Sequence, residues 1–450
     1  MQNIHFIAIG GAIMHQLAIA LKKQGFVVTG SDDEINDPAK SNLKEHGLLP
    51  DQFGWFPEKI KSNLNAIVLG MHARADNPEL LAAQKAGIPI YSFPQYVYEV
   101  SKNKKRIVIA GSHGKTTITS MVMHIMKACG YDFDYLVGAK VPGFEQSVRL
   151  SDAPYIILEG DEYPASVVEK RPKIFFYKPH ISILSGVAWD HINVFPTYEN
   201  YFSQFKQYLE GLDALTKLIY NSEDPEVCRV VAESGQNLIT QPYATPAFKY
   251  ADGQPIVAHG GKDYALSIFG RHNVQNVQAA IKVCKEIGIT ETQALEAIAS
   301  FTGAARRLEK VFETPQLSVF RDFAHAPSKL KATLNAVREA YANHYLVACF
   351  ELHTFSSLTA EFLSEYAHSM DSADTSIVYY SNHTLELKKL PPLAPETVVA
   401  HFQRNDLLAI NNKEALYEKV HALSKNNGKP VFLLLMSSGT FDGIDWNTLK

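Results

Sequence analysis

The sequence predicts an α/β fold made of three consecutive α/β domains. The chain has 450 residues, and a single hydrophobic core stops growing at about 250 to 300 residues. Short apolar runs of strand length alternate with amphipathic stretches of helical length, which is typical of parallel sheets with crossover helices. Such an alternation begins three times along the chain, each time with an apolar run, near His5, Arg106 and Leu317. We therefore expect domains at 1–101, 102–313 and 314–450, the first and third of them Rossmann-like.

The first predicted domain begins with a βαβ unit that has two glycine turns. The turns are Gly10-Gly11 and Gly30-Ser31-Asp32, and each follows a β-type apolar run. The polar stretch Ser101–Lys105 is expected to link this domain to the next. The expected elements are a strand at His5–Ile9, a helix to about Lys23, and strands at Phe26–Thr29 and Ala66–Leu69.

The second and third predicted domains repeat the alternation. In the second we expect strands at Arg106–Ala110, Tyr155–Leu158 and His180–Leu184, and helices at about Thr116–Ala128, Tyr198–Leu212 and Asn273–Ile287. In the third we expect strands at Leu317–Phe320, Tyr345–Phe350, Ser376–Tyr380 and Val431–Met436, and a helix at Ser328–Tyr341. Both patterns favour parallel sheets, whose carboxyl edges carry ligand sites.

Bulk properties exclude several classes of protein. The formal net charge is −4, so nothing in the total favours nucleic acid as a partner. The four cysteines lie far apart and form no C-x-x-C pair, which predicts reduced thiols rather than disulfides or a zinc site. The sequence shows no signal peptide and no apolar stretch of about 18 residues, so we expect a cytoplasmic protein without a membrane span.

A phosphate-binding loop is the strongest local signal. Gly111-Ser112-His113-Gly114-Lys115-Thr116-Thr117 follows a predicted strand and opens a predicted helix. Backbone N–H groups at such a turn converge on one point, and the helix dipole favours an anion there. Lys115 would meet the β- and γ-phosphates of ATP, and the Thr116 hydroxyl would meet Mg²⁺. An accidental glycine-rich turn would not require a lysine and a threonine directly after a strand, although Ile109 replaces one glycine of the longer motif.

Two acidic segments follow successive strands along the chain, both predicted for the same sheet. Glu159-Gly160-Asp161-Glu162 comes after the strand that ends at Leu158, and Trp189-Asp190-His191 comes after the next strand. Taken alone, both are ordinary loop residues. The phosphate loop on the same sheet edge makes them candidate Mg²⁺ ligands, because Mg²⁺ prefers hard ligands and uses few protein groups.

Six ordered motifs resemble the Mur ligase family over almost the whole chain. They are G-S-H-G-K-T-T, E-G-D-E-Y, W-D-H-I-N-V-F, G-R-H-N-V-Q-N, A-R-R-L-E and R-D-F-A-H-A-P. The resemblance implies three α/β domains with a central P-loop ATPase domain, and an enzyme that uses ATP and Mg²⁺ to form an amide bond through an acyl phosphate. It also implies small-molecule substrates of peptidoglycan synthesis or recycling, in a monomer or a homodimer.

The resemblance also implies roles for single residues. Each has a plainer alternative, such as a helix cap for Asn273 or an ion-pair partner of Glu309 for Arg307. The implied catalytic residues are Lys115, Glu162, His191 and Arg307, and the implied metal ligands are Thr116, Glu162 and His191. The implied ATP contacts outside the loop are His272, Asn273, Asn276, Arg307, Asp322 and His325, with Asn276 against the adenine.

Within the family, the first domain is similar to that of the members that hold UDP-N-acetylmuramate. The segments H-F-I-A-I-G-G-A-I-M and V-T-G-S-D carry this likeness. D-E-Y-P-A-S-V-V-E-K-R-P-K, H-I-N-V-F and M-S-S-G-T-F-D-G-I resemble the branch that adds the tripeptide L-Ala-γ-D-Glu-meso-diaminopimelate. Addition of L-alanine is the alternative. The implied sugar-nucleotide contacts are Gly10, Gly11, Ala12, Ile13, Met14, Ser31 and Asp32.

The chain departs from the family pattern at several places. Ala8 replaces the first glycine of the first-domain loop, and Ala326 stands after His325 where a proline is usual. Glu351-Leu352-His353-Thr354 replaces a segment that contains proline and arginine, so recognition of the amine substrate is expected to differ. Lys206 follows His191 by 15 residues, as does a lysine that some members carbamylate, but an ordinary exposed helix lysine is the alternative.

Two other classes of function stay open on the sequence alone. A nicotinamide dehydrogenase would explain Gly10-Gly11 and an acid at Asp32, yet Ala8 and Ile13 occupy two glycine places of its fingerprint. An ATP-switched binding protein would explain the phosphate loop, but it needs no dedicated third α/β domain.

Overall fold

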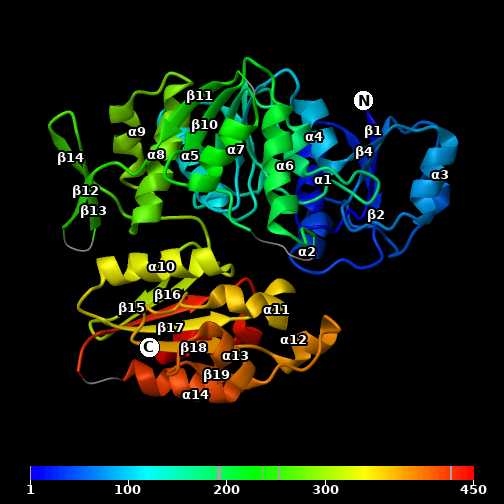
Figure 1. Ribbon diagram of the computed structural model, residues 1–450. Coiled ribbons are helices and arrows are strands. Elements are labelled where there is room, and N and C mark those ends of the chain that lie inside the picture. Colours follow the sequence, from blue (N-terminus) through cyan, green and yellow to red (C-terminus); the bar gives the residue numbers. More distant parts are fainter. Residues whose placement is uncertain (1, 190–193, 236, 252–253, 426–427) are drawn as a thin grey trace. The chain divides into compact units, whose positions relative to one another are not determined.

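The computed structural model describes residues 2–189, 194–235, 237–251, 254–425 and 428–450 (Figure 1). The chain divides into two compact units. The first unit contains Met1–Val187, Phe202–Ala244 and Ala279–Ala297, and the second contains Ala188–Tyr201, Thr245–Gln278 and Ile298–Lys450. No helix in these described ranges combines the length and the apolar character needed to cross a lipid bilayer.

The N-terminal sheet of the first unit is parallel, in the order β2-β1-β3-β4. Successive side chains of a strand point to opposite faces, so Ile4 and Phe6 of β1 pack on one face and Ile7 on the other. The strands are β1 (Asn3–Ile7), β2 (Val27–Ser31), β3 (Ala66–Leu69) and β4 (Ile90–Ser92). The helices are α1 (Met14–Lys23), α2 (Ala39–Glu45), α3 (Pro78–Ala86) and α4 (Phe93–Ser101).

The central sheet of the first unit has the order β11-β10-β9-β5-β8-β6-β7, and only β7 runs antiparallel to its neighbour. Its middle strand β5 is buried from Arg106 to Ala110, as expected of a parallel strand covered on both faces. The strands are β5 (Lys105–Ala110), β6 (Phe133–Leu136), β7 (Val148–Arg149), β8 (Tyr155–Glu159), β9 (Ile181–Leu184), β10 (Lys217–Asn221) and β11 (Ile239–Tyr243). The helices that accompany it in sequence are α5 (Lys115–Ala128), α6 (Tyr198–Glu210), α7 (Pro225–Glu233), α8 (Arg271–Lys285) and α9 (Glu291–Ile298).

The second unit contains a six-stranded sheet in the order β15-β16-β20-β17-β18-β19, parallel except for the β15–β16 pair. Its strands are β15 (Glu309–Glu313), β16 (Leu317–Asp322), β17 (Tyr345–Glu351), β18 (Thr375–Tyr379), β19 (Leu408–Ile410) and β20 (Val431–Met436). Its helices are α10 (Pro327–Ala340), α11 (Ala360–Leu363), α12 (Asn382–Leu387), α13 (Pro395–Phe402) and α14 (Lys413–Ser424). A separate antiparallel sheet joins β12 (Phe248–Ala251), β13 (Gln254–His259) and β14 (Lys262–Ala265).

The predicted α/β class is confirmed, and the predicted strands and helices are found with ends shifted by up to about two residues. Two details differ from the sequence analysis. The second strand does not stop at Thr29 but continues to Ser31, because Gly30 and Ser31 still pair with β1. The third sheet begins before Leu317, since β15 pairs with β16. The three domain boundaries stay predictions.

Ala8 lies in the turn after β1 with φ of 66°, in the left-handed region. An L-residue with a Cβ pays about 1 to 2 kcal/mol there, whereas glycine does not. Ala8 is the residue that replaces the first glycine of the family pattern, so the backbone keeps the conformation that the glycine would favour.

We expect Ala8→Gly to raise the free energy of unfolding by up to about 1 kcal/mol, because it removes this strain. Chemical denaturation monitored by circular dichroism measures the change. Ala12→Gly is the matched control: Ala12 lies in the same loop outside the left-handed region, so glycine there only adds freedom to the unfolded chain and should destabilise. Equal effects of the two variants would contradict the strain argument.

Candidate active site

The phosphate loop connects β5 to α5 at the carboxyl edge of the central sheet. Gly114 caps α5 with φ of 76°, and Gly111 has φ of 130°, both in the region that favours glycine. A Cβ on Gly111 would lie 2.4 Å from Ser185 Oγ. The loop therefore approaches the end of β9 so closely that only glycine fits at its first position.

The segment after β9 holds the loop in place. Ser112 donates its backbone N–H to the Gly186 carbonyl at 2.9 Å, and Ser185 Oγ donates to the His113 carbonyl at 2.5 Å. A Cβ on Gly186 would lie 1.6 Å from His113 Cε1. The absence of a side chain at Gly186 thus creates the space that the His113 ring occupies.

Lys115 is held between the loop and an acidic strand end. Its Nζ donates to the Gly111 carbonyl at 2.5 Å and to Glu162 Oε2 at 2.8 Å. Burial alone would lower the pKa of Lys115, but the charges of Glu162 and Asp161 outweigh it and raise that pKa. The ammonium therefore stays charged at neutral pH, as a phosphate ligand requires.

Thr116 points at Glu159, an acid of the segment that the sequence analysis named as a candidate Mg²⁺ ligand but to which the family resemblance gave no single role. Its Oγ1 donates to Glu159 Oε1 at 2.7 Å, and Gly138 donates its backbone N–H to Glu159 Oε2 at 2.8 Å. Glu159 is the last residue of β8, which pairs with β5 directly beside the loop. The motif singles out the acidic segment, and the order of strands in the sheet places Glu159 against the Thr116 hydroxyl.

Asp161 forms an ion pair with Lys173, a residue of the segment that resembles the tripeptide-adding branch. Its Oδ2 lies 2.8 Å from Lys173 Nζ. Burial would raise the pKa of Asp161, but Lys173 and Lys115 lower it overall. The backbone from Tyr163 to Lys173 closes on itself, with Lys173 N–H donating to the Tyr163 carbonyl at 2.9 Å. This closure returns Lys173 to the edge of the phosphate loop.

These oxygen atoms fit a magnesium site. Mg²⁺ takes one or two carboxylates and completes its octahedron with phosphates and water. A threonine hydroxyl next to Glu159, with Glu162 nearby on the same strand end, supplies ligands of that kind. In the described part of the chain no group of three His, Cys, Asp or Glu side chains is arranged to hold a metal alone.

A second group of predicted residues gathers around Asp322 in the second unit. Asp322 accepts backbone N–H bonds from Leu308 at 2.7 Å and from Ala324 at 2.8 Å. The guanidinium of Arg307 lies 5.0 Å from the centre of the Phe323 ring. His325 Nδ1 lies 2.8 Å from the Phe323 carbonyl oxygen. The junction before β15 and the end of β16 therefore bring Arg307, Asp322 and His325 into one cluster.

The G-R-H-N-V-Q-N motif forms the start of α8. Burial lowers the pKa of His272, although the charge of Asp322 opposes this, so the imidazole is neutral near pH 7. Asn273 Nδ2 donates to the Phe269 carbonyl at 2.9 Å, and Asn276 Nδ2 lies 3.5 Å from Asn273 Oδ1. His272 thus belongs with the Asp322 cluster, and the two asparagines form a buried polar pair at the helix start.

The first-domain turn places a buried carboxylate beneath Gly10. Gly10 donates its backbone N–H to Asp32 Oδ2 at 2.7 Å, and Lys59 Nζ donates to Ser31 Oγ at 3.0 Å. Burial raises the pKa of Asp32 from 3.8 to about 6. The predicted sugar-nucleotide residues from Gly10 to Met14, with Ser31 and Asp32, therefore meet at the carboxyl edge of the N-terminal sheet.

Two residues predicted at the metal site, His191 and Lys206, belong to none of these groups. His191 lies outside the described residues. Lys206 lies half-buried on α6, and its ammonium has no hydrogen-bond or ion-pair partner within the described ranges. Carbamylation of Lys206 stays a prediction.

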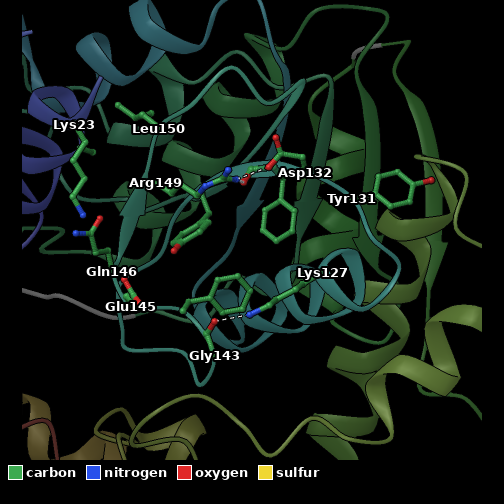
Figure 2. Close-up of a pocket in the computed structure, with 13 residues that line it drawn as sticks. Lys23, Lys127, Tyr131, Asp132, Gly143, Glu145, Gln146, Arg149 and Leu150 are labelled. Atoms are coloured by element: carbon green, nitrogen blue, oxygen red, sulfur yellow. Dashed lines mark hydrogen bonds and ion pairs between the residues drawn. The ribbon is translucent and has the colours of Figure 1, made fainter. Parts of the chain in front are cut away.

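A cavity of about 540 Å³ in the first unit lies away from these motifs (Figure 2). It opens between the C-terminal end of α1 and the β6–β7 edge, where Lys127 bonds to the Gly143 carbonyl and Arg149 to Asp132. None of the predicted site residues lines it. The candidate active site is therefore defined by the sheet edges and not by this cavity.

A phosphate loop with carboxylates at the neighbouring strand ends is typical of P-loop nucleotide-binding enzymes. Comparison with known proteins identifies the family within this class. The chain matches the family models described as "Mur ligase middle domain" over residues 109–284 and "Mur ligase family, catalytic domain" over residues 3–105. It is 32% identical over 390 residues to the UDP-N-acetylmuramate–L-alanine ligase of Arthrobacter sp. (strain FB24), covering 84% of this chain and 80% of that protein.

A second relative acts on a peptide according to its name. The UDP-N-acetylmuramate–L-alanyl-gamma-D-glutamyl-meso-2,6-diaminoheptandioate ligase of Escherichia coli (strain K12) is 29% identical over 345 residues, 75% of each chain. The crystal structure of a murein peptide ligase from Psychrobacter arcticus 273-4 superposes with a TM-score of 0.67 at 22% identity, covering 100% of this chain and 98% of that chain. The chain belongs to the Mur ligase family, and it is an ATP-dependent ligase that forms amide bonds.

We expect Gly186→Ala to weaken ATP binding at least about tenfold, because its Cβ must displace the His113 ring and with it the loop. Isothermal titration calorimetry with a non-hydrolysable ATP analogue measures the affinity. Gly211→Ala is the matched control, since Gly211 lies outside the left-handed region and a Cβ there meets its nearest neighbours at an ordinary 3.4 Å and 3.6 Å. Unchanged nucleotide affinity in Gly186→Ala would contradict the view that the end of β9 shapes the loop.

Asp32 predicts a pH-dependent difference between the wild type and Asp32→Asn. Folding raises the pKa of Asp32 to about 6, so the folded state favours the protonated carboxyl. The free energy of unfolding is therefore highest below about pH 4 and falls as the pH rises through 6 and Asp32 ionises. The asparagine variant has no such loss. Its stability relative to the wild type should therefore increase between pH 4.5 and pH 7.5, by at most about 3 kcal/mol. Denaturant unfolding at both pH values measures this; a pH-independent difference would contradict it.

Proposed function

We propose that this chain joins UDP-N-acetylmuramate to the tripeptide L-alanyl-γ-D-glutamyl-meso-diaminopimelate, with ATP and Mg²⁺, in peptidoglycan recycling in the cytoplasm. The observation that carries the proposal is the linked set of charges at the phosphate loop. Glu162 holds Lys115, and Lys173 from the tripeptide-type segment holds Asp161 beside them. The segment that resembles the tripeptide branch thereby contributes to the geometry of the catalytic edge.

The reaction has two steps. The lactyl carboxylate of the muramate attacks the γ-phosphorus of ATP, which releases ADP and forms an acyl phosphate. The amine of the acceptor then attacks the acyl carbon, and the tetrahedral intermediate expels inorganic phosphate and loses a proton to give the amide. A free carboxylate is a poor electrophile, so activation by phosphate is what makes the second step accessible.

The residues of the first unit would position and neutralise the phosphates. Lys115 supplies a permanent positive charge, and the N-terminus of α5 supplies oriented N–H groups. Thr116, Glu159 and Glu162 would hold Mg²⁺, and His191, which belongs to a segment of the second unit, is the proposed ligand of a second ion. When bound, Mg²⁺ would withdraw charge from the phosphate oxygens.

Residues of the second unit and of the first-domain turn would contact the nucleotide and the UDP-sugar. Arg307 would meet the phosphates, and Asp322 and His325 the region of ribose and phosphate. His272, Asn273 and Asn276 would border the nucleotide, with Asn276 against adenine. Gly10 to Met14, Ser31 and Asp32 would contact the UDP-sugar.

Addition of L-alanine is the competing acceptor assignment. It is favoured by the relatives of 30% identity or more, which are named UDP-N-acetylmuramate–L-alanine ligases. The K-R-P-K segment with its Lys173–Asp161 pair favours the tripeptide. The dehydrogenase and the ATP-switched binding protein are set aside because the family is one of amide ligases.

We expect release of phosphate from ATP to require both UDP-N-acetylmuramate and an amine acceptor. With both acceptors present, mass spectrometry should show the tripeptide product in at least about tenfold excess over the L-alanine product. Lys115→Ala should lower turnover by more than about a thousandfold, since it removes the charge on the transferred phosphate.

Lys127→Ala is the control for loss of a lysine, because Lys127 lies in the cavity of Figure 2 and should leave turnover unchanged. Preference for L-alanine would overturn the acceptor assignment alone. Phosphate release that needs no amine, or full activity of Lys115→Ala, would overturn the proposed mechanism.

A further inference from the structure

The carboxyl edge of the third sheet carries a buried acid that the proposed mechanism does not use. Glu351 is the last residue of β17 and only 2% exposed. Its strand pairs with β20, with Phe350 opposite Met436, so the segment that begins at Ser437 leaves the sheet beside Glu351. In open parallel sheets, ligands bind outside this edge.

One carboxylate oxygen of Glu351 binds the segment that follows β20. Ser437 Oγ and the backbone N–H of Phe441 both donate to Oε2, the latter at 2.8 Å. These two bonds fasten the segment after β20 to the end of β17. They leave the second oxygen, Oε1, without a hydrogen bond from any residue in the described ranges.

The nearest polar partner of Oε1 is an imidazole at a distance too long for a hydrogen bond. His353 Nδ1 lies 3.7 Å from Glu351 Oε1. Nδ1 is itself buried and has no hydrogen-bond partner among the residues that the structure describes, although 39% of the His353 side chain is exposed. A Cβ on Gly439 would lie 2.6 Å from Nδ1, so the glycine provides the room for this ring.

The charge of Glu351 is not balanced by the protein. No lysine or arginine of the described residues forms an ion pair with it. A buried carboxylate without a cation is costly, and such groups are usually paired or bound to a metal. A metal needs more ligands than one carboxylate and one imidazole, and no group of three ligating side chains occurs in the described residues. An anionic ligand would be repelled, whereas an ammonium group can donate to Oε1 and offset the charge of Glu351.

We propose that Glu351 and His353 form a subsite that receives a protonated amine of the acceptor. An ammonium N–H placed between the two atoms donates to Glu351 Oε1, and the imidazole borders the same group. The proposal rests on the proposed function, because it takes an amine as the substrate of the second unit. Two amines meet the description: the distal amine of the diamino acid in the tripeptide, which stays protonated, and the reacting amine as it arrives, before it loses one proton to solvent and attacks as the free amine.

Glu351→Gln tests the subsite with little change in shape. The amide oxygen still accepts from Ser437 and Phe441, so the anchor is kept and only the charge is lost. We expect the KM for the acceptor to rise about 10- to 100-fold, the usual range for a hydrogen bond to a charged group. The KM values for ATP and UDP-N-acetylmuramate should change less than about twofold, and the melting temperature should hold.

Three acceptors tell the two amines apart: the tripeptide, the same peptide with its distal amine acetylated, and L-alanine. If Glu351 binds the distal amine, the variant loses affinity for the unmodified tripeptide only. If it binds the reacting amine, the KM rises for all three. Unchanged KM values for every acceptor, or an equal rise for all substrates including ATP, would overturn the subsite.

A second variant covers the case in which Glu351→Gln fails to fold. His353→Ala removes a partly exposed ring and should raise the KM for the same acceptors as Glu351→Gln, whereas an unchanged KM counts against the subsite. Ser437→Ala is the control for the anchor, since it keeps the charge and should lower the melting temperature without changing acceptor preference. A wild type without amine-dependent turnover would instead overturn the proposed function.

Discussion

The ion pair between Lys115 and Glu162 organises the catalytic edge of the first unit. Its side chains are 15% and 2% exposed, so water screens the pair weakly. Removal of one partner from such a pair leaves an uncompensated buried charge, at a cost of about 3 to 5 kcal/mol. The pair therefore ties the phosphate loop to the acidic strand end, and Lys115 is held by the chain in the charged state that phosphate recognition needs.

The loop is held from the other side by contacts that only glycine permits. Gly111 approaches Ser185, and the ring of His113 occupies the space that a side chain on Gly186 would fill. Three neighbouring strands, β8, β5 and β9, each contribute one part: an acid, a glycine turn and a supporting segment. Because the strands are parallel, these parts meet at one edge without any long-range loop. Precise placement of this kind is what phosphoryl transfer depends on, since its catalysis is chiefly positioning and charge neutralisation.

Local sequence patterns were sufficient for the alternating strands and helices and for the phosphate loop, because strand periodicity, glycine turns and the G-K-T order are local signals. They were not sufficient for contacts that depend on the order of strands. Glu159 meets Thr116 only because β8 lies beside β5, and no spacing in the sequence shows that neighbour relation. β15 was missed since its sequence, E-K-V-F-E, reads as polar, although it joins the edge of the third sheet. At Ala8 the backbone keeps a left-handed turn without the glycine that would signal it.

The buried acids of the two units differ in how their charge is balanced. Around the phosphate loop, Glu162 pairs with Lys115, Asp161 with Lys173, and Glu159 accepts from Thr116. That edge has two ammonium groups for three carboxylates, so most of its negative charge is offset within the chain. At the edge of the third sheet, the described residues give Glu351 hydrogen-bond donors on one oxygen only and no lysine or arginine partner. We therefore assign the positive charge at Glu351 to the acceptor, because in a reaction that joins an acid to an amine, the acceptor is the substrate that carries one.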